Sequence, residues 1–258
     1  MSDFNSSLVL VKYESLGNDY LVAEDGRALP LVPALCDRHR GVGADGLLLF
    51  DPDRLAVRII NPDGSEAEKS GNGLRIAAAH AVLEHAAPGH FTLQVPAGAL
   101  EVRVLARDGR SVKTEVDVGA PVVGALEPVA GVEGRAVDAG NPHFVVFGEP
   151  VTPERCRELG PRLETDPRFP NRTNVQLCEV VDRSRIRIQV WERGAGYTLA
   201  SGTSAAAAAA ACLAAGLVDD RLTVEMPGGS LPVERRPDGH LLQTGSARRV
   251  FRATFELP

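Results

Sequence analysis

Residues 70–79 read SGNGLRIAAA and residues 201–211 read SGTSAAAAAAA, and these two stretches decide the fold. Each places a small hydroxyl residue and a glycine before an alanine-rich run, which is the pattern of a helix capped by Ser70 or Ser201. A helix N-terminus presents backbone N–H groups that have no intrahelical acceptor, so it suits an anion. We therefore expect the two helix starts to bind one substrate carboxylate. The alternative is that both serines only cap their helices.

The composition is that of a globular protein with one large domain or two smaller ones. The chain has 258 residues, of which 44% are hydrophobic and 24% are charged, and its formal net charge is −6. This charge disfavours nucleic acid and anionic membranes as partners. No apolar run reaches the ~20 residues of a membrane span, and residues 1–25 lack a signal-peptide pattern. The cytosol is the expected location.

The cysteine pattern gives no sign of a disulfide framework or a metal site. Four cysteines are scattered without a Cys-x-x-Cys pair, and we expect them to be reduced and mostly buried: Cys36, Cys156, Cys178 and Cys212. Cys36 and His39 are spaced like two metal ligands, but no second pair completes a site. We expect no metal and no cofactor.

Hydrophobic patterning and turn signals predict many short strands and a few helices. In the first half, strands are expected at 8–13, 20–22, 47–50, 57–60, 91–95, 100–106 and 111–117, and helices at 31–40 and 72–86. In the second half, strands are expected at 144–147, 174–181, 185–191, 221–226, 231–235, 240–243 and 249–257, and a helix at 205–215. Thr152 and Pro153 indicate the start of another helix, which Gly160 would end. Residues 119–134, rich in Gly, Pro and Ala, are expected to be a linker.

The order of elements repeats along the chain. GNDYLV at 17–22 resembles GNPHFV at 140–145, and each half continues to one of the two alanine-rich helices. This predicts two similar halves, 1–118 and 119–248, each with strands wrapped around a central helix.

Several polar residues in loops suit a zwitterionic amino acid. Arg193 has the fork geometry to grip a second carboxylate. His143 and Glu192 are candidates for handling or orienting protons. Asparagines at turns and strand ends could hold polar groups of the same ligand, although each alone is commonly a turn former: Asn18, Asn61, Asn141 and Asn174.

The chain resembles the diaminopimelate epimerase family, whose members work without pyridoxal phosphate. The resemblance rests on motifs spread over the whole chain: SLGNDY (15–20), CDRHRGVGADGLLL (36–49), NPDGSEAEKSGNG (61–73), AGNPHFVVF (139–147), ERGAGYTLASGTSAA (192–206), MPGGSL (226–231) and TGSA (244–247). It implies an α+β fold of two pseudo-symmetric domains, each a barrel-like, mostly antiparallel sheet around a central helix, with the active site in the cleft between them. The last strand, about 249–258, would complete the first domain.

The resemblance also implies an activity and a set of site residues. The activity is interconversion of LL- and meso-diaminopimelate in lysine biosynthesis. A homodimer is expected on separate grounds, because dimers are the commonest soluble oligomers. In the family's pattern a cysteine precedes each central helix, and one acts as base while the other acts as acid; here these positions are Ser70 and Ser201. By position, Gly71, Asn72, Gly202 and Thr203 would cradle the carboxylate, Asn61, Asn141, Asn174 and Arg193 the distal end, and Asn18, His143 and Glu192 the reacting end.

The two serines leave three interpretations. The chain is an epimerase whose cysteines have been replaced to stop turnover, or a serine variant that isomerises another amino acid. In the second case the base would be Glu192, His143 or Glu14, which itself departs from the family's pattern. In the third case it is a protein that binds an amino acid without converting it.

Overall fold

The computed structural model describes residues 7–67, 70–96 and 98–257. These residues form two compact units. Unit 1 contains the chain up to Val116 and the segment from Gly245 onward, and unit 2 contains Asp117–Thr244. The sequence predicts a boundary near residue 118. No described helix is long and apolar enough to cross a membrane.

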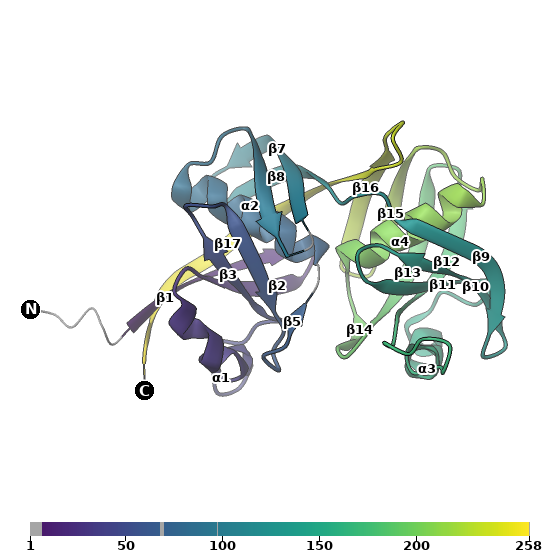
Figure 1. The fold of residues 1–258 in the computed structure, drawn as a ribbon, viewed down its shortest axis with the longest axis horizontal. Coiled ribbons are helices and arrows are strands. Elements are labelled where there is room, and N and C mark those ends of the chain that lie inside the picture. Colours follow the sequence, from purple (N-terminus) through teal and green to yellow (C-terminus); the bar gives the residue numbers. More distant parts are fainter. Residues whose placement is uncertain (1–6, 68–69, 97, 258) are drawn as a thin grey trace, which may run out of the picture. The chain divides into compact units, whose positions relative to one another are not determined.

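Unit 1 is a closed ring of strands around a helix (Figure 1). Each strand of the ring pairs with the next, and β17 closes it by pairing with both β8 and β1. The short strand β5 (Glu66–Ala67) is added to β4. The ring consists of β1 (Ser7–Ser15), β2 (Asn18–Ala23), β3 (Leu47–Asp51), β4 (Ala56–Ile60), β6 (His90–Val95), β7 (Gly98–Asp108), β8 (Ser111–Asp117) and the last part of β17 (Leu241–Glu256).

Helix α2 (Gly71–His85) lies inside this ring. It is buried continuously from Gly71 to Val82, and it packs against β1, β2 and β3. Alanine and glycine allow this, because a helix surrounded by strands needs small side chains on several faces. Two shorter elements, η1 (Gly26–Leu31) and α1 (Val32–Cys36), connect β2 to β3.

Unit 2 has the same plan around α4 (Gly202–Ala214), which is buried from Gly202 to Leu213 (Figure 1). Helix α3 (Pro153–Glu164) connects β11 to β12, and β14 (Gly196–Thr198) is added to β13. Leu241, the first residue of β17, exchanges backbone hydrogen bonds with Val118 and Gly119, which precede β9. The row consists of β9 (Val122–Val129), β10 (Val132–Asp138), β11 (Pro142–Phe147), β12 (Asn174–Asp182), β13 (Arg185–Glu192), β15 (Arg221–Met226), β16 (Gly229–Arg235) and the start of β17.

The strand pairings match between the units. The β1–β2 and β10–β11 pairs are antiparallel, and the next pairs, β2–β3 and β11–β12, are parallel. The β4–β6 and β13–β15 pairs are again parallel, and the central helix precedes β6 in one unit and β15 in the other. The predicted repeat and the α+β class of two barrel-like halves are therefore confirmed.

Four expectations from the sequence are wrong, and the first three concern a supposed linker and the bounds of a helix and two strands. Residues 119–134 are not a linker, because β9 and β10 pair there as a hairpin that turns at Ala130 and Gly131, both with positive φ. The helix expected at 31–40 ends at Cys36. The Asp37 carboxylate accepts the N–H groups of His39 and Arg40, which a longer helix would pair with backbone carbonyl groups. The last two expected strands are one continuous strand, β17.

Gly160 does not end helix α3, which continues to Glu164. A Cβ at this position would lie 2.4 Å from Trp191 Cγ. The glycine therefore serves close packing of α3 on β13 rather than termination, and the sequence gives no sign of which of these roles a helical glycine has.

Replacing Gly160 with alanine is expected to lower the free energy of unfolding by about 1–2 kcal/mol. The overlap with Trp191 is severe, so overpacking should cost the upper part of the usual range, about 2–3 kcal/mol, against the ~1 kcal/mol gained in helix propensity. Urea denaturation measures the change. Gly89→Ala, where a Cβ meets nothing within 4 Å, is the control. Equal stability of the two variants would show that Trp191 can move aside.

Candidate active site

Ser70 caps helix α2 as the sequence predicts. Its Oγ accepts a hydrogen bond from the backbone N–H of Gly73 at 3.1 Å, and its carbonyl oxygen accepts the N–H of Leu74 at 2.9 Å. A Cβ on Gly73 would lie 3.2 Å from Ser70 Oγ, so any other residue here would require the cap to shift by a few tenths of an ångström. The Ser70 side chain is half-buried, and its hydroxyl therefore stands at the start of an otherwise enclosed helix.

Tyr20 is a neighbour of Ser70 that sequence reasoning missed. Its Oη lies 3.3 Å from Ser70 Oγ. The ring packs over Gly46, where a Cβ would lie 2.7 Å from Tyr20 Cε1 and 2.6 Å from the Ile60 carbonyl oxygen. The missing side chain of Gly46 thus sets Tyr20 against Ser70. The motif contained the glycine, but nothing in the sequence named its partner.

Asn18 and Asn72 are brought together beside the start of α2. The Asn72 side-chain amide donates to Asn18 Oδ1 at 3.3 Å, and Asn18 Nδ2 donates to Asp45 Oδ2 at 2.6 Å. The Arg75 guanidinium donates to Asn72 Oδ1 from within the core. Burial lowers the pKa of Arg75 to about 10, so the group remains a cation at neutral pH. A cation under the first turn of α2 adds to the positive potential of the helix N-terminus.

Asp19 is the centre of a charged cluster that fixes the strand end carrying Asn18. Lys12 Nζ lies 2.6 Å and Arg38 Nη2 lies 2.7 Å from its carboxylate. Burial acts to raise the pKa of Asp19, but hydrogen bonds and charge from Arg38 and Lys12 outweigh it and lower the pKa to about 2. Arg38 also binds Asp45 at 2.6 Å, which links this cluster to Asn18.

Asn61 lies in the turn after β4. Its Nδ2 donates to Ser65 Oγ at 3.0 Å, and its carbonyl accepts the N–H of Gly64 at 2.9 Å. These contacts are those of a turn former. The hydrogen bonds of Asn61 are thus to residues of its own turn, Gly64 and Ser65, rather than to Ser70.

Ser201 caps helix α4 in unit 2 with a similar geometry. Its Oγ accepts the N–H of Ser204 at 3.4 Å, and its carbonyl accepts the N–H of Ala205 at 3.0 Å. Thr203 Oγ1 lies 3.4 Å from Ser201 Oγ. Gln243 donates to the Gly202 carbonyl at 2.7 Å from a fully buried position. Both helix starts therefore combine a serine cap with a glycine at the first helical position.

His143 is buried and hydrogen-bonded through both ring nitrogens. Its Nδ1 lies 3.0 Å from Gln176 Nε2, and its Nε2 lies 2.8 Å from Asn141 Oδ1. An amide N–H donates, so Nδ1 accepts and Nε2–H donates to Asn141. Gln176 also donates to Ser204 Oγ at 3.0 Å. This geometry makes His143 a positioning residue for Asn141 and connects it to the first turn of α4.

Arg193 follows β13 in a loop that two buried side chains hold. Asn174 Oδ1 accepts the Arg193 N–H at 3.0 Å, and Glu164 Oε1 accepts the N–H of Gly194 at 2.9 Å. Glu164 Oε2 also accepts Trp191 Nε1–H at 2.7 Å. The structure thus joins Asn174 to Arg193. Glu164 lies 28 residues before the loop at the end of α3, and no sequence signal marked it.

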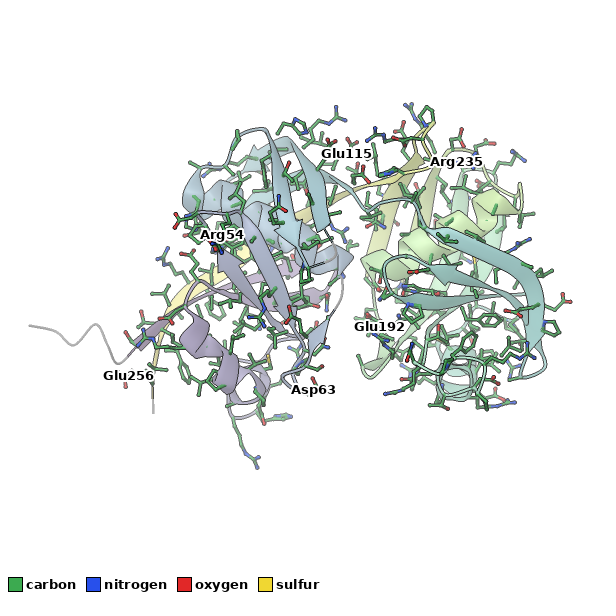
Figure 2. The ribbon with its side chains drawn as sticks, in the orientation of Figure 1. Arg54, Asp63, Glu115, Glu192, Arg235 and Glu256 are labelled. Atoms are coloured by element: carbon green, nitrogen blue, oxygen red, sulfur yellow. The ribbon has the colours of Figure 1, made fainter. Side chains whose placement is uncertain are left out.

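Glu192 lies half-buried at the end of β13, opposite Gly196 in the strand pairing (Figure 2). Its carbonyl accepts the N–H of Ala195 at 3.1 Å, which closes the tight turn that carries Arg193. Glu192 and Arg193 therefore belong to one loop of unit 2.

Each unit thus offers a serine-capped helix start surrounded by side-chain amides. The backbone N–H groups of a first helical turn point along the helix axis toward a bound anion. Polar side chains with fixed positions can then hold the remaining groups of a ligand such as an amino acid. Neither serine has a carboxylate or an imidazole among its hydrogen-bond partners within the described residues.

The comparisons with known proteins agree over nearly the whole chain. The model of the family described as diaminopimelate epimerase matches residues 10–123 and 135–250. Diaminopimelate epimerase 2 of Nostoc sp. is 41% identical over 269 residues, which cover 93% of this chain and 92% of that protein. The diaminopimelate epimerase of Moorella thermoacetica is 38% identical over 275 residues, covering 96% and 99%. The solved structure of a predicted epimerase from Pseudomonas aeruginosa is similar in fold, with a TM-score of 0.74 at 21% identity, covering 96% of this chain and 99% of that one.

Asp19→Asn is expected to lower the free energy of unfolding by about 2 kcal/mol at neutral pH, because it removes a carboxylate whose pKa is about 2 in the folded protein and 3.8 ordinarily. Since the folded pKa is the lower one, this stabilisation is present above pH 3.8 and is lost as the pH falls toward 2. Urea denaturation of both proteins across this range measures it. Asp53→Asn, at an exposed turn outside the cluster, is the control. A difference that stays constant down to the lowest pH would contradict the assignment.

Proposed function

Because the chain belongs to the diaminopimelate epimerase family, we propose that it binds diaminopimelate through the helix starts at Ser70 and Ser201. The reaction is the interconversion of LL- and meso-diaminopimelate by proton transfer at the α-carbon, without a cofactor. The observation that carries this proposal is the doubled cap: two buried helices begin with the same serine–glycine geometry in two units of the same topology. The family match extends over both halves and does not favour another isomerisation or a purely binding role.

The substrate carboxylate is assigned to the backbone N–H groups of Gly71, Asn72, Gly202 and Thr203. Removing the α-proton moves negative charge onto the carboxylate oxygens, so donors fixed in advance stabilise the transition state more than the ground state. A helix N-terminus contributes about 0.3–1 kcal/mol to an exposed anion and up to about 2 kcal/mol when partly buried. The buried Arg75 cation strengthens this effect at α2.

The remaining site residues divide into two groups. Arg193, in the loop fixed by Asn174 and Glu164, binds the distal carboxylate, with Asn61 and Asn141 on the same end of the substrate. Asn18, His143 and Glu192 belong to the reacting end. His143 holds Asn141 in position rather than carrying the proton, since both its ring nitrogens have side-chain partners.

The two serines limit the reaction. A cysteine thiol has an ordinary pKa near 8.5 and can be tuned to a thiolate, whereas an alcohol is far less acidic. Each additional pKa unit between base and proton donor costs about 1.4 kcal/mol. We propose that the chain keeps the binding site of the family and that its α-proton transfer is very slow.

The protein is also proposed to act in the cytosol, as a homodimer. Cys178 and Cys212 lie 3.6 Å apart between their sulfur atoms as buried free thiols, a state that a reducing compartment maintains. Two-fold dimers are the commonest soluble oligomers.

Placing thiols at both helix starts is expected to give epimerase activity. The double variant Ser70→Cys/Ser201→Cys should exchange the α-proton of diaminopimelate in heavy water and interconvert its isomers, as followed by NMR, while the unchanged protein exchanges it very slowly. Ser65→Cys, a thiol at an exposed turn position, is the control and should stay inactive. A correctly folded double variant that leaves diaminopimelate untouched would contradict the proposed substrate. Rapid exchange by the unchanged chain would contradict the proposed role of the serines.

Arg193→Ala is expected to weaken diaminopimelate binding at least tenfold, because a charge-assisted bond to a carboxylate contributes about 1.5–3 kcal/mol. Isothermal titration calorimetry on the serine protein measures binding without turnover. Arg193→Lys should recover only part of the affinity, since ammonium lacks the guanidinium fork. Arg183→Ala, at the exposed β12–β13 turn, is the control. Unchanged affinity in Arg193→Ala would refute the assignment.

A further inference from the structure

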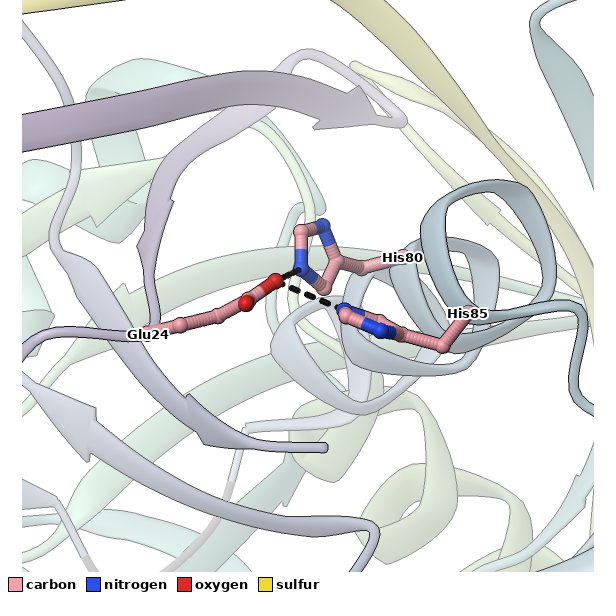
Figure 3. Close-up of side chains that lie close together, drawn as sticks. All are labelled: Glu24, His80 and His85. Carbon is pink, nitrogen blue, oxygen red and sulfur yellow. Dashed lines mark hydrogen bonds and ion pairs between the residues drawn. The ribbon is translucent and has the colours of Figure 1, made fainter. Parts of the chain in front are cut away.

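A second polar cluster lies at the other end of helix α2 from Ser70. It consists of Glu24, His80 and His85, whose ligand atoms all lie within 4.8 Å of one another (Figure 3). Among the described residues this is the group of three side chains that could hold a metal ion. Helix α2 rises ~1.5 Å per residue, so its C-terminal end at His85 is roughly 20 Å from its cap. The cluster is therefore separate from the serine site.

The geometry converges on one carboxylate oxygen. Glu24 Oε1 lies 2.8 Å from His80 Nε2 and 2.7 Å from His85 Nε2 (Figure 3). Both histidines are on α2, and Glu24 directly follows β2 in the same unit. Helix α2 ends immediately after His85, with Ala86 in the left-handed region at φ 52°. The potential of a helix C-terminus favours a cation at this end.

The surrounding side chains hold both imidazole rings in place. His80 is 1% exposed, and its Nδ1 lies 3.2 Å from the hydroxyl oxygen of the buried Tyr13. Phe50 stacks on the His85 ring at 5.7 Å and meets the His80 ring edge-on at 5.1 Å. A metal-binding histidine characteristically has its second nitrogen hydrogen-bonded. A tyrosine hydroxyl both donates and accepts, so Tyr13 can satisfy His80 Nδ1 with the ion bound or absent.

The cluster is open to solvent on one side. The His85 side chain is 26% exposed and that of Glu24 is 41% exposed, so an ion can enter and keep water as a further ligand. The neighbouring Glu84 carboxylate is bound by Arg249 at 2.5 Å and Arg252 at 2.7 Å. The negative charge available to an ion is therefore that of Glu24.

We propose that Glu24, His80 and His85 form a binding site for a divalent cation of the zinc type. Two imidazole nitrogens and one carboxylate oxygen are a ligand set that zinc uses with water in the fourth position, whereas calcium and magnesium prefer oxygen ligands alone. Zinc–ligand bonds of about 2.0–2.2 Å require neighbouring ligand atoms to be roughly 3.3 Å apart. Glu24 Oε1, now 2.8 Å from His80 Nε2 and 2.7 Å from His85 Nε2, would withdraw from each nitrogen by about 0.5–0.6 Å, which its exposed side chain permits. The ion would replace the two imidazole–carboxylate hydrogen bonds.

Titration of the full-length protein with Zn²⁺ alone, followed by calorimetry, tests the proposal. The expected result is one Zn²⁺ bound per chain, with at least tenfold weaker binding in His85→Gln and in Glu24→Gln. Neither of these side chains is fully buried, and thermal melts without metal confirm that both variants fold. Titration with Co²⁺ adds a direct readout, since a four-coordinate site with nitrogen and oxygen ligands gives visible absorption bands that both variants should lose.

Two exposed histidines outside the cluster provide matched controls. His39→Gln and His90→Gln should bind Zn²⁺ as tightly as the unchanged protein. The proposal is overturned if the unchanged protein binds no Zn²⁺, if the cluster variants bind it equally well, or if the control variants lose it to the same extent. None of these measurements uses the epimerase reaction, so their outcome is independent of the proposed function.

Discussion

A helix enclosed by strands can exist only if its backbone ends and every face of its surface are accommodated inside the barrel. Helices α2 and α4 meet the second condition with alanine and glycine, which allow burial from Gly71 to Val82 and from Gly202 to Leu213. The backbone at the start of each helix is accommodated by a serine cap that accepts the N–H of the third helical residue. The earlier N–H groups of each first turn are what a ligand can use. The architecture therefore places backbone N–H donors, which suit an anion, at the start of the central helix in each unit before any substrate-specific residue is added.

The parts of this fold that could be predicted from the sequence are those determined by local chemistry. The serine–glycine starts, the alanine runs and the hairpin turn at residues 182–184 carry their own signals, and the structure places helices and strands there. Strand β9 was missed because its proline and glycine residues resemble a linker, and only pairing with β10 makes it a strand. Gly160 was misinterpreted because its role depends on Trp191, which lies 31 residues away in the sequence.

The same distinction applies to the site. Ser70, Ser201 and Arg193 lie in motifs that identify them, whereas the residues that hold the proposed site residues in place within each unit come from distant segments. Asp45 positions Asn18, and Gln176 joins His143 to the first turn of α4. Glu164 fixes the loop of Arg193 through Gly194 and Trp191. A glutamate at a helix end or a glutamine within a strand has no pattern of its own, so these partners follow only from three-dimensional packing.

The two ends of helix α2 favour ligands of opposite charge, an anion at the start and a cation at the end. At its start, the first-turn N–H groups and the Arg75 cation favour a carboxylate. At its end, the carbonyl groups favour a cation, and Glu24 and the two histidines supply ligand atoms there. The electrostatic potentials at the two ends of α2 would influence each other if the whole helix lay in a low-dielectric interior. Water reaches the exposed Glu24, however, and screens the potential at the C-terminal end. Occupation of the cation site should therefore alter substrate binding only weakly, and its main effect should be on the stability of unit 1, since an ion that binds only the folded state stabilises it.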